Sequence, residues 1–426
     1  MKGLLPPTLF ALHASLGVLL GQTASIDWNR AQQLFQRSQR GETLSPEDQR
    51  YLDEAKRQRA AHSQDGPQGV PRSAIDWNRA RELFRRSQSG EKLTPEDQRY
   101  LDDAKRLHDS GQRPQRNAAP PGPVEHHTPL TELTAPYRDQ AGGLYPDGKN
   151  EPPAVQRAAA SRALEQIRPR DSAGNPSEDG KIVLLSIGMS NTTQEFSAFK
   201  EIADPDPRKA SRIVIVDGAQ GGQDAQRWSG ATNPTWQVAD RRLAQARVTP
   251  QQVQAVWIKQ AIAGPSGGFP AATDQLRDEL ARICRVAREC YPNLQIAFLS
   301  SRIYAGYAKT SLNPEPYAYE SAFAVRGLIE QQMKGDTQLN CDPAKGPITA
   351  PVLLWGPYLW ADGTHPRKDN GLTWEEQDLG PDGTHPSSTG RAKVARLLLD
   401  FFTSDPNSKR WFTATQEAQP GPTTAK

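Results

Sequence analysis

Short apolar runs and longer amphipathic stretches alternate through the middle and end of the chain. Apolar runs rich in Ile, Val and Leu occur at 181–188, 212–216, 253–262, 294–300 and 352–355. Runs of this kind predict strands that are buried on both faces. Stretches with helical spacing lie at 153–167, 236–247, 272–291, 317–334 and 388–402. The alternation predicts an α/β fold with a parallel sheet, covered by helices on both sides and built by right-handed crossovers.

A serine lies on the turn after the first of these strands. The strand leads into Gly188-Met189-Ser190-Asn191, and the polar, amphipathic residues after Asn191 predict a helix. Open α/β sheets bind ligands at the carboxyl ends of their strands, where the next helix presents free N–H groups. Ser190 therefore lies where a nucleophile would be useful. A turn glycine followed by an N-cap serine would give the same local pattern.

A nucleophilic serine needs a base, and the predicted globular region contains few histidines. Five of the seven histidines lie near the N-terminus, at the ends of N-terminal helices or in a linker: His13, His62, His108, His126 and His127. His365 and His385 remain, each within the pentapeptide Asp-Gly-Thr-His-Pro. An aspartate three residues before a histidine can turn back onto the imidazole and fix its tautomer.

The region 128–404 resembles the SGNH/GDSL hydrolase superfamily. Gly188-Met189-Ser190-Asn191 is similar to the Gly-x-Ser-Asn form of sialate O-acetylesterase-like members. The segment from Asp382 to His385 is similar to the Asp-x-x-His block that precedes the final helix, whereas His365 does not precede that helix. The resemblance implies a flavodoxin-like three-layer α/β/α sandwich with a five-stranded parallel sheet. It also implies Ser190 as nucleophile, His385 as base and Asp382 as orienting acid, with no metal or organic cofactor.

The resemblance further implies an oxyanion hole made by the N–H of Ser190, a glycine N–H and a side-chain amide. By its spacing from the second strand, Gly222 is the best match for the glycine and Gly221 the next. Many members carry Gly-x-Asn-Asp where this chain has Trp257-Ile258-Lys259-Gln260. Either Gln260 supplies the amide or the third donor is missing, and losing one donor typically costs about 10²–10³ in rate.

Asn191, His365 and Trp360 are the candidate substrate contacts. Trp360 belongs to an aromatic group around the first Asp-Gly-Thr-His, together with Trp355, Tyr358 and Trp374. Aromatic faces often line sugar sites, but core packing explains these residues equally well. His365 is either a substrate contact or a base that competes with His385. We expect a small-molecule or carbohydrate ester as substrate, with an O-acetylated carbohydrate favoured.

The first 24 residues are typical of a secretory signal peptide. One lysine is followed by an apolar run at 8–21, with small residues near the expected cleavage after Ala24. The run is shorter than the roughly 20 residues that span a bilayer. We therefore expect a secreted or periplasmic protein with no stable membrane insertion after removal of the signal.

Two segments repeat at an offset of 49 residues, beginning at Ile26 and Ile75. The pattern predicts helical hairpins at 25–60 and 73–108, whose second helices begin at caps such as Ser45-Pro46-Glu47-Asp48. Because each unit is too small to bury much surface, we expect the hairpins to be marginal, to pair, or to dock on an unknown protein or surface. Trp28 and Trp77 are either docking residues or small hairpin cores. Polar linkers at 61–72 and 109–127, the second expected to be disordered, and a tail at 405–426 complete the organisation.

The charge balance and the cysteine count exclude some classes of partner and of site. Lys and Arg number 52 against 49 Asp and Glu, a balance that offers no case for nucleic-acid binding. Cys284, Cys290 and Cys341 are too few for a disulfide scaffold or a cysteine zinc site. At most one bridge can form, more plausibly to Cys341, and structural burial is the default interpretation.

The leading hypothesis from the sequence is an exported serine esterase. A non-catalytic binding protein is the alternative, with a degenerate SGNH module and the hairpins as its interaction device. An O-acyltransferase would use the same acyl-enzyme. Gly-x-Ser-x-Gly of the α/β-hydrolase elbow is absent because Thr192 occupies its last position, and Gly218 to Gly222 does not match a dinucleotide fingerprint.

Overall fold

The computed structural model describes residues 45–53, 79, 83, 93–109 and 125–414. The chain divides into two compact units, 1–115 and 116–426. The expected signal peptide, the linker 61–72, most of the linker 109–127, and both Trp28 and Trp77 lie outside the described residues, as do the last residues of the tail. Within the described ranges, no helix combines the length and the apolarity needed to cross a bilayer.

In the first unit, the chain is helical at 46–53 and in α4 (Pro95–Asp109). Both helices begin at the same kind of cap. The Asp48 N–H donates to Ser45 Oγ at 3.1 Å, and the Asp97 N–H donates to Thr94 Oγ1 at 3.1 Å. These hydroxyls satisfy N–H groups that have no partner within the helix. The predicted start of the second helix in each repeat is therefore confirmed.

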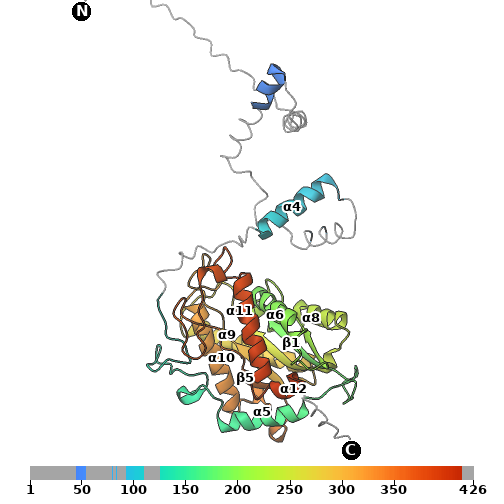
Figure 1. Ribbon diagram of the computed structural model, residues 1–426, viewed down its shortest axis with the longest axis vertical. Coiled ribbons are helices and arrows are strands. Elements are labelled where there is room, and N and C mark those ends of the chain that lie inside the picture. The colour runs from blue at the N-terminus through green and yellow to red at the C-terminus, as the bar shows by residue number, and fades with distance from the viewer. Residues whose placement is uncertain (1–44, 54–78, 80–82, 84–92, 110–124, 415–426) are drawn as a thin grey trace, which may run out of the picture. The chain divides into compact units, whose positions relative to one another are not determined.

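The second unit contains a five-stranded, all-parallel sheet, which confirms the predicted α/β fold class (Figure 1). Its strands are β1 (Ile182–Gly188), β2 (Ile213–Val216), β3 (Val253–Lys259), β4 (Ile296–Ser300) and β5 (Val352–Trp355), in the order β2-β1-β3-β4-β5. The expectation that the third strand continues to residue 262 is wrong. Ala261 and Ile262 are buried in the following loop, so their apolar character reflects packing and not strand pairing.

Helices connect the strands as the periodicity predicts. They are α5 (Ala154–Gln166), α6 (Ser190–Ala203), α7 (Ala225–Trp228), α8 (Pro234–Gln245), α9 (Ala271–Cys290), α10 (Tyr317–Met333), α11 (Ser388–Ser404) and α12 (Lys409–Phe412). Short 3-10 turns lie at η2 (Pro146–Gly148), η3 (Pro250–Gln252), η4 (Thr337–Leu339), η5 (Pro343–Lys345) and η6 (Glu376–Asp378). The sequence did not predict α7 and α12, because four residues are too few to show a helical period.

The helices form layers against the sheet (Figure 1). α6 packs along α11, and α9 packs along α10. The Phe196 ring of α6 stacks on Trp257 of β3 with ring centroids 5.5 Å apart. Phe412 of α12 stacks on Phe402 of α11 at 5.3 Å, so the core includes residues beyond the end of α11. The N-terminal half of α6 is thus packed against β3.

All three cysteines are free in the structure, and no bridge joins Cys341 to either of the others. Cys284 is fully buried in α9, where burial raises the pKa of its thiol to about 12. Cys290 and Cys341 are only partly buried. The interpretation as buried structural residues therefore holds fully for Cys284 alone.

Candidate active site

The candidate nucleophile lies where β1 passes into α6. Ser190 is the first residue of that helix, so its backbone N–H has no partner within the helix. Gly188 allows the tight passage, because a Cβ there would lie 2.3 Å from Thr192 Oγ1 and 2.5 Å from the Lys259 carbonyl oxygen. Residue types with a side chain at position 188 would push the start of α6 away from β3. The strand order reverses between β1 and β3, the place where sheets of this type bind their ligands.

The structure brings Ser190, His385 and Asp382 into one hydrogen-bonded chain. Ser190 Oγ lies 2.7 Å from His385 Nε2, and His385 Nδ1 lies 2.5 Å from Asp382 Oδ2. Ser190 and His385 are 195 residues apart in the sequence. This is the order of groups that activates a serine: a base in contact with the hydroxyl, and an acid that orients the base.

The second Asp-Gly-Thr-His segment forms a turn that folds the aspartate under its own histidine. Asp382 Oδ1 accepts the N–H groups of His385 at 3.0 Å and Thr384 at 3.1 Å. Gly383 has φ of 65°, and a Cβ there would lie 1.7 Å from the Tyr307 carbonyl oxygen. The glycine is thus required both by its left-handed conformation and by the close approach of a neighbouring chain segment.

Asp382 remains ionised because of these hydrogen bonds. Burial alone would raise its pKa, but the bond from the His385 ring and those from the two backbone N–H groups outweigh burial and leave the pKa well below the usual range. A carboxylate in this state can hold the imidazole with Nδ1 protonated. Nε2 is then free to accept the proton of Ser190.

Asn191 connects α6 to the loop that carries His385. Its side chain is only 1% exposed, and Nδ2 donates to the Thr384 carbonyl at 2.8 Å. The expectation that Asn191 contacts substrate is corrected by this burial. The side chain therefore holds the loop of His385 beside Ser190.

The expected oxyanion donors lie on the loops around Ser190. A Cβ on Gly221 would lie 3.9 Å from Ser190 Cβ, which places Gly221 beside the nucleophile, and the next residue, Gly222, has φ of 73°. Gln260 leaves the sheet after β3, whose Lys259 pairs with Gly188 of β1. Both amide atoms of Gln260 are buried without a hydrogen-bond partner among the described residues. A free amide donor is therefore available at the carboxyl ends of the strands, where Ser190 also lies.

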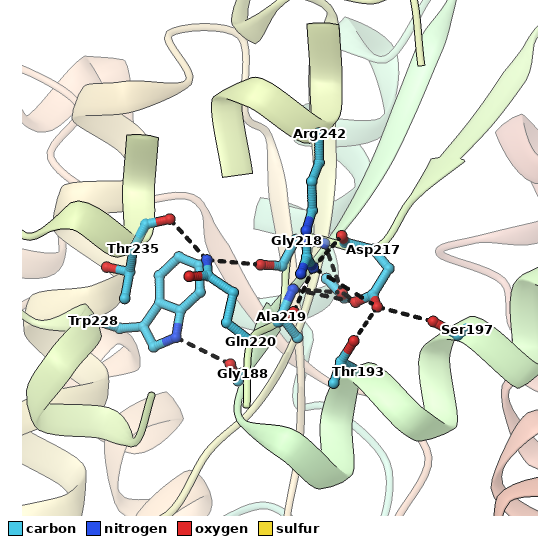
Figure 2. A network of polar contacts seen from close by, with 11 residues as sticks. Gly188, Thr193, Ser197, Asp217, Gly218, Ala219, Gln220, Trp228, Thr235 and Arg242 are labelled. Atoms are coloured by element: carbon cyan, nitrogen blue, oxygen red, sulfur yellow. Dashed lines mark hydrogen bonds and ion pairs between the residues drawn. The ribbon is translucent and has the colours of Figure 1, made fainter. Parts of the chain in front are cut away.

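Asp217 is a partly buried carboxylate that the sequence did not single out. It follows β2 directly, and Figure 2 shows it accepting hydrogen bonds from Thr193 and from Ser197 of α6, the latter at 3.0 Å. It also accepts the Ser186 hydroxyl of β1 at 2.6 Å. Burial raises the pKa of Asp217, and these bonds oppose the rise. The carboxylate joins β1, β2 and the first turns of α6, and so helps to fix the position of Ser190.

The loop after Asp217 is held from its other side (Figure 2). Arg242 Nη1 of α8 donates to the carbonyl oxygens of Asp217 at 2.8 Å and Ala219 at 2.6 Å. The Gln220 amide donates to the Thr235 carbonyl at 2.8 Å. These contacts order the loop that leads to Gly221 and Gly222. Its position after a predicted strand was the available sequence signal, but the partners come from distant helices.

Buried charges lie under the site and were also not predicted. Lys259 Nζ lies 2.5 Å from Glu195 Oε1, and both side chains are fully buried. Burial lowers the pKa of Lys259 to about 8, and the charge of Glu195 opposes this shift. Arg302, just after β4, is also buried, and two of its guanidinium nitrogens have no hydrogen-bond partner among the described residues.

The aromatic residues expected to line a sugar site belong to the core. Trp360 is 0% exposed, and its indole Nε1 donates to Glu315 Oε1 at 2.8 Å. Trp355, Tyr358 and Trp374 are buried as well. The expectation that Trp360 contacts substrate is therefore corrected, because a fully enclosed ring presents no face to a ligand. The aromatic argument for a carbohydrate substrate has no support in this structure.

His365 lies outside the hydrogen-bonded chain of Ser190. Its Nδ1 is 3.1 Å from the Asp362 carbonyl oxygen and 3.4 Å from Asp362 Oδ2. Its ring lies against His126 at 4.9 Å between centroids. Of the two identical pentapeptides, only the second delivers its histidine to the serine.

No protein-family model and no curated protein matches the chain. Among solved structures, an acylhydrolase candidate from Bacteroides fragilis is 12% identical, with a TM-score of 0.31, and the match covers 59% of this chain and 95% of that one. The periplasmic domain of a lipopolysaccharide acetyltransferase from Salmonella ser. Paratyphi A is 12% identical, with a TM-score of 0.29 and coverage of 57% and 94%. The salicylyl-acyltransferase SsfX3 from a tetracycline biosynthetic pathway is 13% identical, with a TM-score of 0.28 and coverage of 52% and 54%. Because the identities and TM-scores are this low, these structures carry no argument about function. The assignment of function therefore rests on the geometry of the site.

Proposed function

We propose that this protein is a serine esterase that works through an acyl-enzyme on Ser190. The observation that carries the proposal is the unbroken chain from Ser190 Oγ to His385 Nε2 at 2.7 Å and from His385 Nδ1 to Asp382 Oδ2 at 2.5 Å. The non-catalytic alternative is less favoured, because a binding protein has no use for a serine, a base and an ionised acid held in sequence.

The reaction would follow from the positions of these groups. His385 Nε2 accepts the Ser190 proton as Oγ attacks the ester carbonyl carbon, and the carbonyl oxygen becomes an oxyanion. His385 then gives the proton to the departing alcohol oxygen, which leaves an acyl group on Ser190. Water, deprotonated by the same nitrogen, attacks the acyl carbon. The bond between that carbon and Ser190 Oγ then breaks, the acid leaves, and His385 returns the proton to Oγ. Asp382 holds the imidazole and balances its charge throughout.

The oxyanion would be held by three donors. The Ser190 N–H at the start of α6 is one, a backbone N–H of the Gly221-Gly222 segment is the second, and the Gln260 amide is the third. The free state of Gln260 Nε2 supports its assignment, since a buried amide without a partner gains a strong bond when a negative oxygen forms.

The substrate class we propose is an O-acetylated carbohydrate, and the location we propose is outside the cytoplasm. The acetyl group is suggested by the resemblance of the Gly-x-Ser-Asn segment, and export by the signal-like residues 1–24. Release of acetate from acetylated sugars, measured beside release from longer acyl esters, tests the substrate. Sequencing the N-terminus of protein secreted by an expressing cell tests the export.

The first experiment is hydrolysis of p-nitrophenyl acetate by the purified protein and by Ser190→Ala. We expect turnover by the unaltered chain, and a loss of several orders of magnitude in kcat in Ser190→Ala, because the attacking oxygen is gone. A serine-directed fluorophosphonate should label Ser190, identified by peptide mass spectrometry. Ser172→Ala, which removes the hydroxyl of an exposed turn residue ahead of β1, serves as the control that stays active and is labelled.

Two outcomes would contradict the proposal. One is a folded protein that shows neither turnover nor labelling, which would favour the binding-protein hypothesis. The other is turnover that persists in Ser190→Ala. Formation of an acylated alcohol in the presence of added sugar, at the expense of free acid, would assign acyl transfer in place of hydrolysis.

A further inference from the structure

A second cluster of chemically capable side chains lies around the first Asp-Gly-Thr-His segment. Asp362 Oδ2 is 2.9 Å from His126 Nδ1 and 3.4 Å from His365 Nδ1. One ligand atom from each of the three residues lies within 4.8 Å of the other two. His126 and Asp362 are 236 residues apart in the sequence. The fold therefore brings together two imidazoles and one carboxylate. None of the three belongs to the hydrogen-bonded chain that starts at Ser190.

Burial within the cluster is uneven. Asp362 is only 7% exposed, and its Oδ1 has no hydrogen-bond partner among the described residues. The side chains of His126 and His365 are 71% and 65% exposed. Over the described part of the chain, these two histidines are the only ion-pair partners of Asp362. A buried carboxylate whose only ion-pair partners are imidazoles lacks a full countercharge. Burying such a charge costs free energy unless a cation binds next to it.

We propose that His126, Asp362 and His365 bind one divalent transition-metal ion, with Zn²⁺ as the best fit. Imidazole nitrogen and carboxylate oxygen are its ordinary ligands, at about 2.0–2.2 Å, which puts tetrahedral ligand atoms about 3.3 Å apart. The two separations to Asp362 Oδ2, 2.9 and 3.4 Å, already lie near that value. Ca²⁺ and Mg²⁺ prefer sets made of oxygen alone, so two imidazoles favour zinc.

The metal would supply the countercharge that Asp362 lacks, and the exposed imidazoles leave an open route for its entry. Each ring would coordinate through Nδ1 after moving its proton to Nε2, so a neutral ring loses no proton overall. A water molecule would complete the coordination on the exposed side, since three protein ligands leave one tetrahedral position.

The loop that carries Asp362 and His365 is held in place by the rest of the fold. Arg367 Nη1 donates to the carbonyl oxygens of Tyr358 at 2.6 Å and Trp360 at 3.1 Å. The Trp374 N–H donates to the Gly363 carbonyl at 2.7 Å. Two of the three ligands are therefore positioned without the metal, which reduces the entropy lost on binding.

His126 comes from the segment ahead of the first strand, and that segment has its own anchors. The His127 ring stacks on Tyr319 at 4.6 Å between centroids, and the Leu130 N–H donates to the Tyr358 hydroxyl at 3.0 Å. The bound ion would therefore link the start of the second unit to the loop after β5. Its expected role is to hold this segment on the domain, and no step of ester hydrolysis requires it.

The test is titration of the chelator-treated, full-length protein with ZnCl₂ in a calorimeter. We expect one ion per chain, and a rise in Tm with zinc, because the ion binds only the folded site. His126→Gln, His365→Gln and Asp362→Asn should each weaken binding by at least about 10²-fold, more than the loss of an outer-shell partner usually costs. CoCl₂ should give the visible absorption of a four-coordinate ion in the unaltered protein and not in the three ligand variants.

His385→Gln is the matched control, since it removes the imidazole of the serine site and leaves the three proposed ligands in place. It should bind zinc as the unaltered chain does, and so should Ser190→Ala, which separates this test from that of esterase activity. The exposed imidazoles of His126 and His365 can be replaced with little effect on folding, and equal Tm values without metal check this.

The proposal is overturned by a dissociation constant above about 1 mM for zinc, corresponding to only about −4 kcal/mol. It is also overturned if binding survives all three ligand variants or is lost in His385→Gln. Equal or tighter binding of CaCl₂ or MgCl₂ would contradict the choice of a transition metal.

Discussion

The two Asp-Gly-Thr-His segments show how one local sequence can serve two sites. Both contain a glycine with positive φ, 57° at Gly363 and 65° at Gly383, and both bring the aspartate near its own histidine. What differs is the third group, since Ser190 meets His385 and His126 meets Asp362. The local turn prepares an acid and an imidazole, and the surrounding fold decides their chemistry.

At this residue scale, the depressed pKa of Asp382 predicts an acid-dependent loss of stability. Its folded pKa lies below the unfolded value of about 3.9, so the stabilisation is present above that value and is lost as pH falls toward the folded pKa. The free energy of unfolding of the unaltered chain, relative to Asp382→Asn, should therefore be greatest near pH 6 and shrink between about pH 5 and pH 2.

Urea unfolding of both proteins at several pH values, followed by circular dichroism, measures this difference. Asp179→Asn is a suitable control, because Asp179 lies on an exposed turn ahead of β1. A difference for Asp382→Asn that stays constant from pH 6 to pH 2 would show that the carboxylate gains nothing from its hydrogen bonds in the folded state.

At the scale of elements, the contact between α6 and β3 carries a fully buried ion pair. Lys259 and Glu195 are both inaccessible to solvent. Lys259 directly precedes Gln260, and Glu195 lies five residues after Ser190. The pair therefore joins the elements that carry Ser190 and Gln260. The cost of burying both charges makes the pair sensitive to the loss of either partner.

We expect Lys259→Met to lower the free energy of unfolding by about 3–5 kcal/mol, because the Glu195 carboxylate would stay buried without its cation. The double variant Lys259→Met/Glu195→Leu should recover a large part of the loss, since apolar replacement of a buried pair is often neutral. Urea denaturation of the two single variants and the double variant closes the cycle. Simple additivity of the two single effects would refute the coupling.

The Asp217 network extends the same logic to a second pair of elements. Hydroxyl groups of β1 and α6 converge on one carboxylate at the end of β2, and Arg242 of α8 holds the carbonyls behind it (Figure 2). Four elements thus meet under the turn of the nucleophile. This shared framework, together with the tight turn at Gly188, helps to fix the position of Ser190.

At the scale of the whole molecule, the second unit contains the sheet, the helices around it and the complete candidate site. Its aromatic core runs from Phe196 and Phe199 of α6 to Phe402 and Phe412 near its end. The residues of the serine chain and of the proposed metal site all lie within 116–426. The unit has the features of a domain that folds without the repeats.

A shortened chain of residues 116–414 should therefore unfold cooperatively, with a Tm close to that of the second unit in the full protein, and should hydrolyse p-nitrophenyl acetate with kcat within about two-fold of the full chain. Calorimetry and the ester assay make the comparison. A matching chain that ends at 404 removes Trp411 and Phe412 from the core and should unfold at a lower temperature. Loss of folding on removal of residues 1–115 would mean that the repeats are part of the domain.

Much of the fold and the central part of the site could be predicted because their signals are local. Five apolar runs became five parallel strands, and residue 355 ends the last one as predicted. Ser190 was singled out by its turn after a strand, and the resemblance to a known family pointed to Asp382 and His385, in a turn before a helix, as its partners. The predicted end of β3 was wrong, because buried loop residues such as Ile262 are as apolar as the residues of a buried strand.

The sequence by itself determined the order of strands and helices, the caps of α4 and the turn chemistry of both Asp-Gly-Thr-His segments, since each depends on residues a few positions apart. Tertiary structure alone decided that Trp360 is enclosed, that Asn191 holds the Thr384 carbonyl and that His126 meets Asp362. Those outcomes depend on which distant segments the parallel sheet and its crossovers bring together. Contact between residues far apart in the chain is a property of packing, and no local pattern contains it.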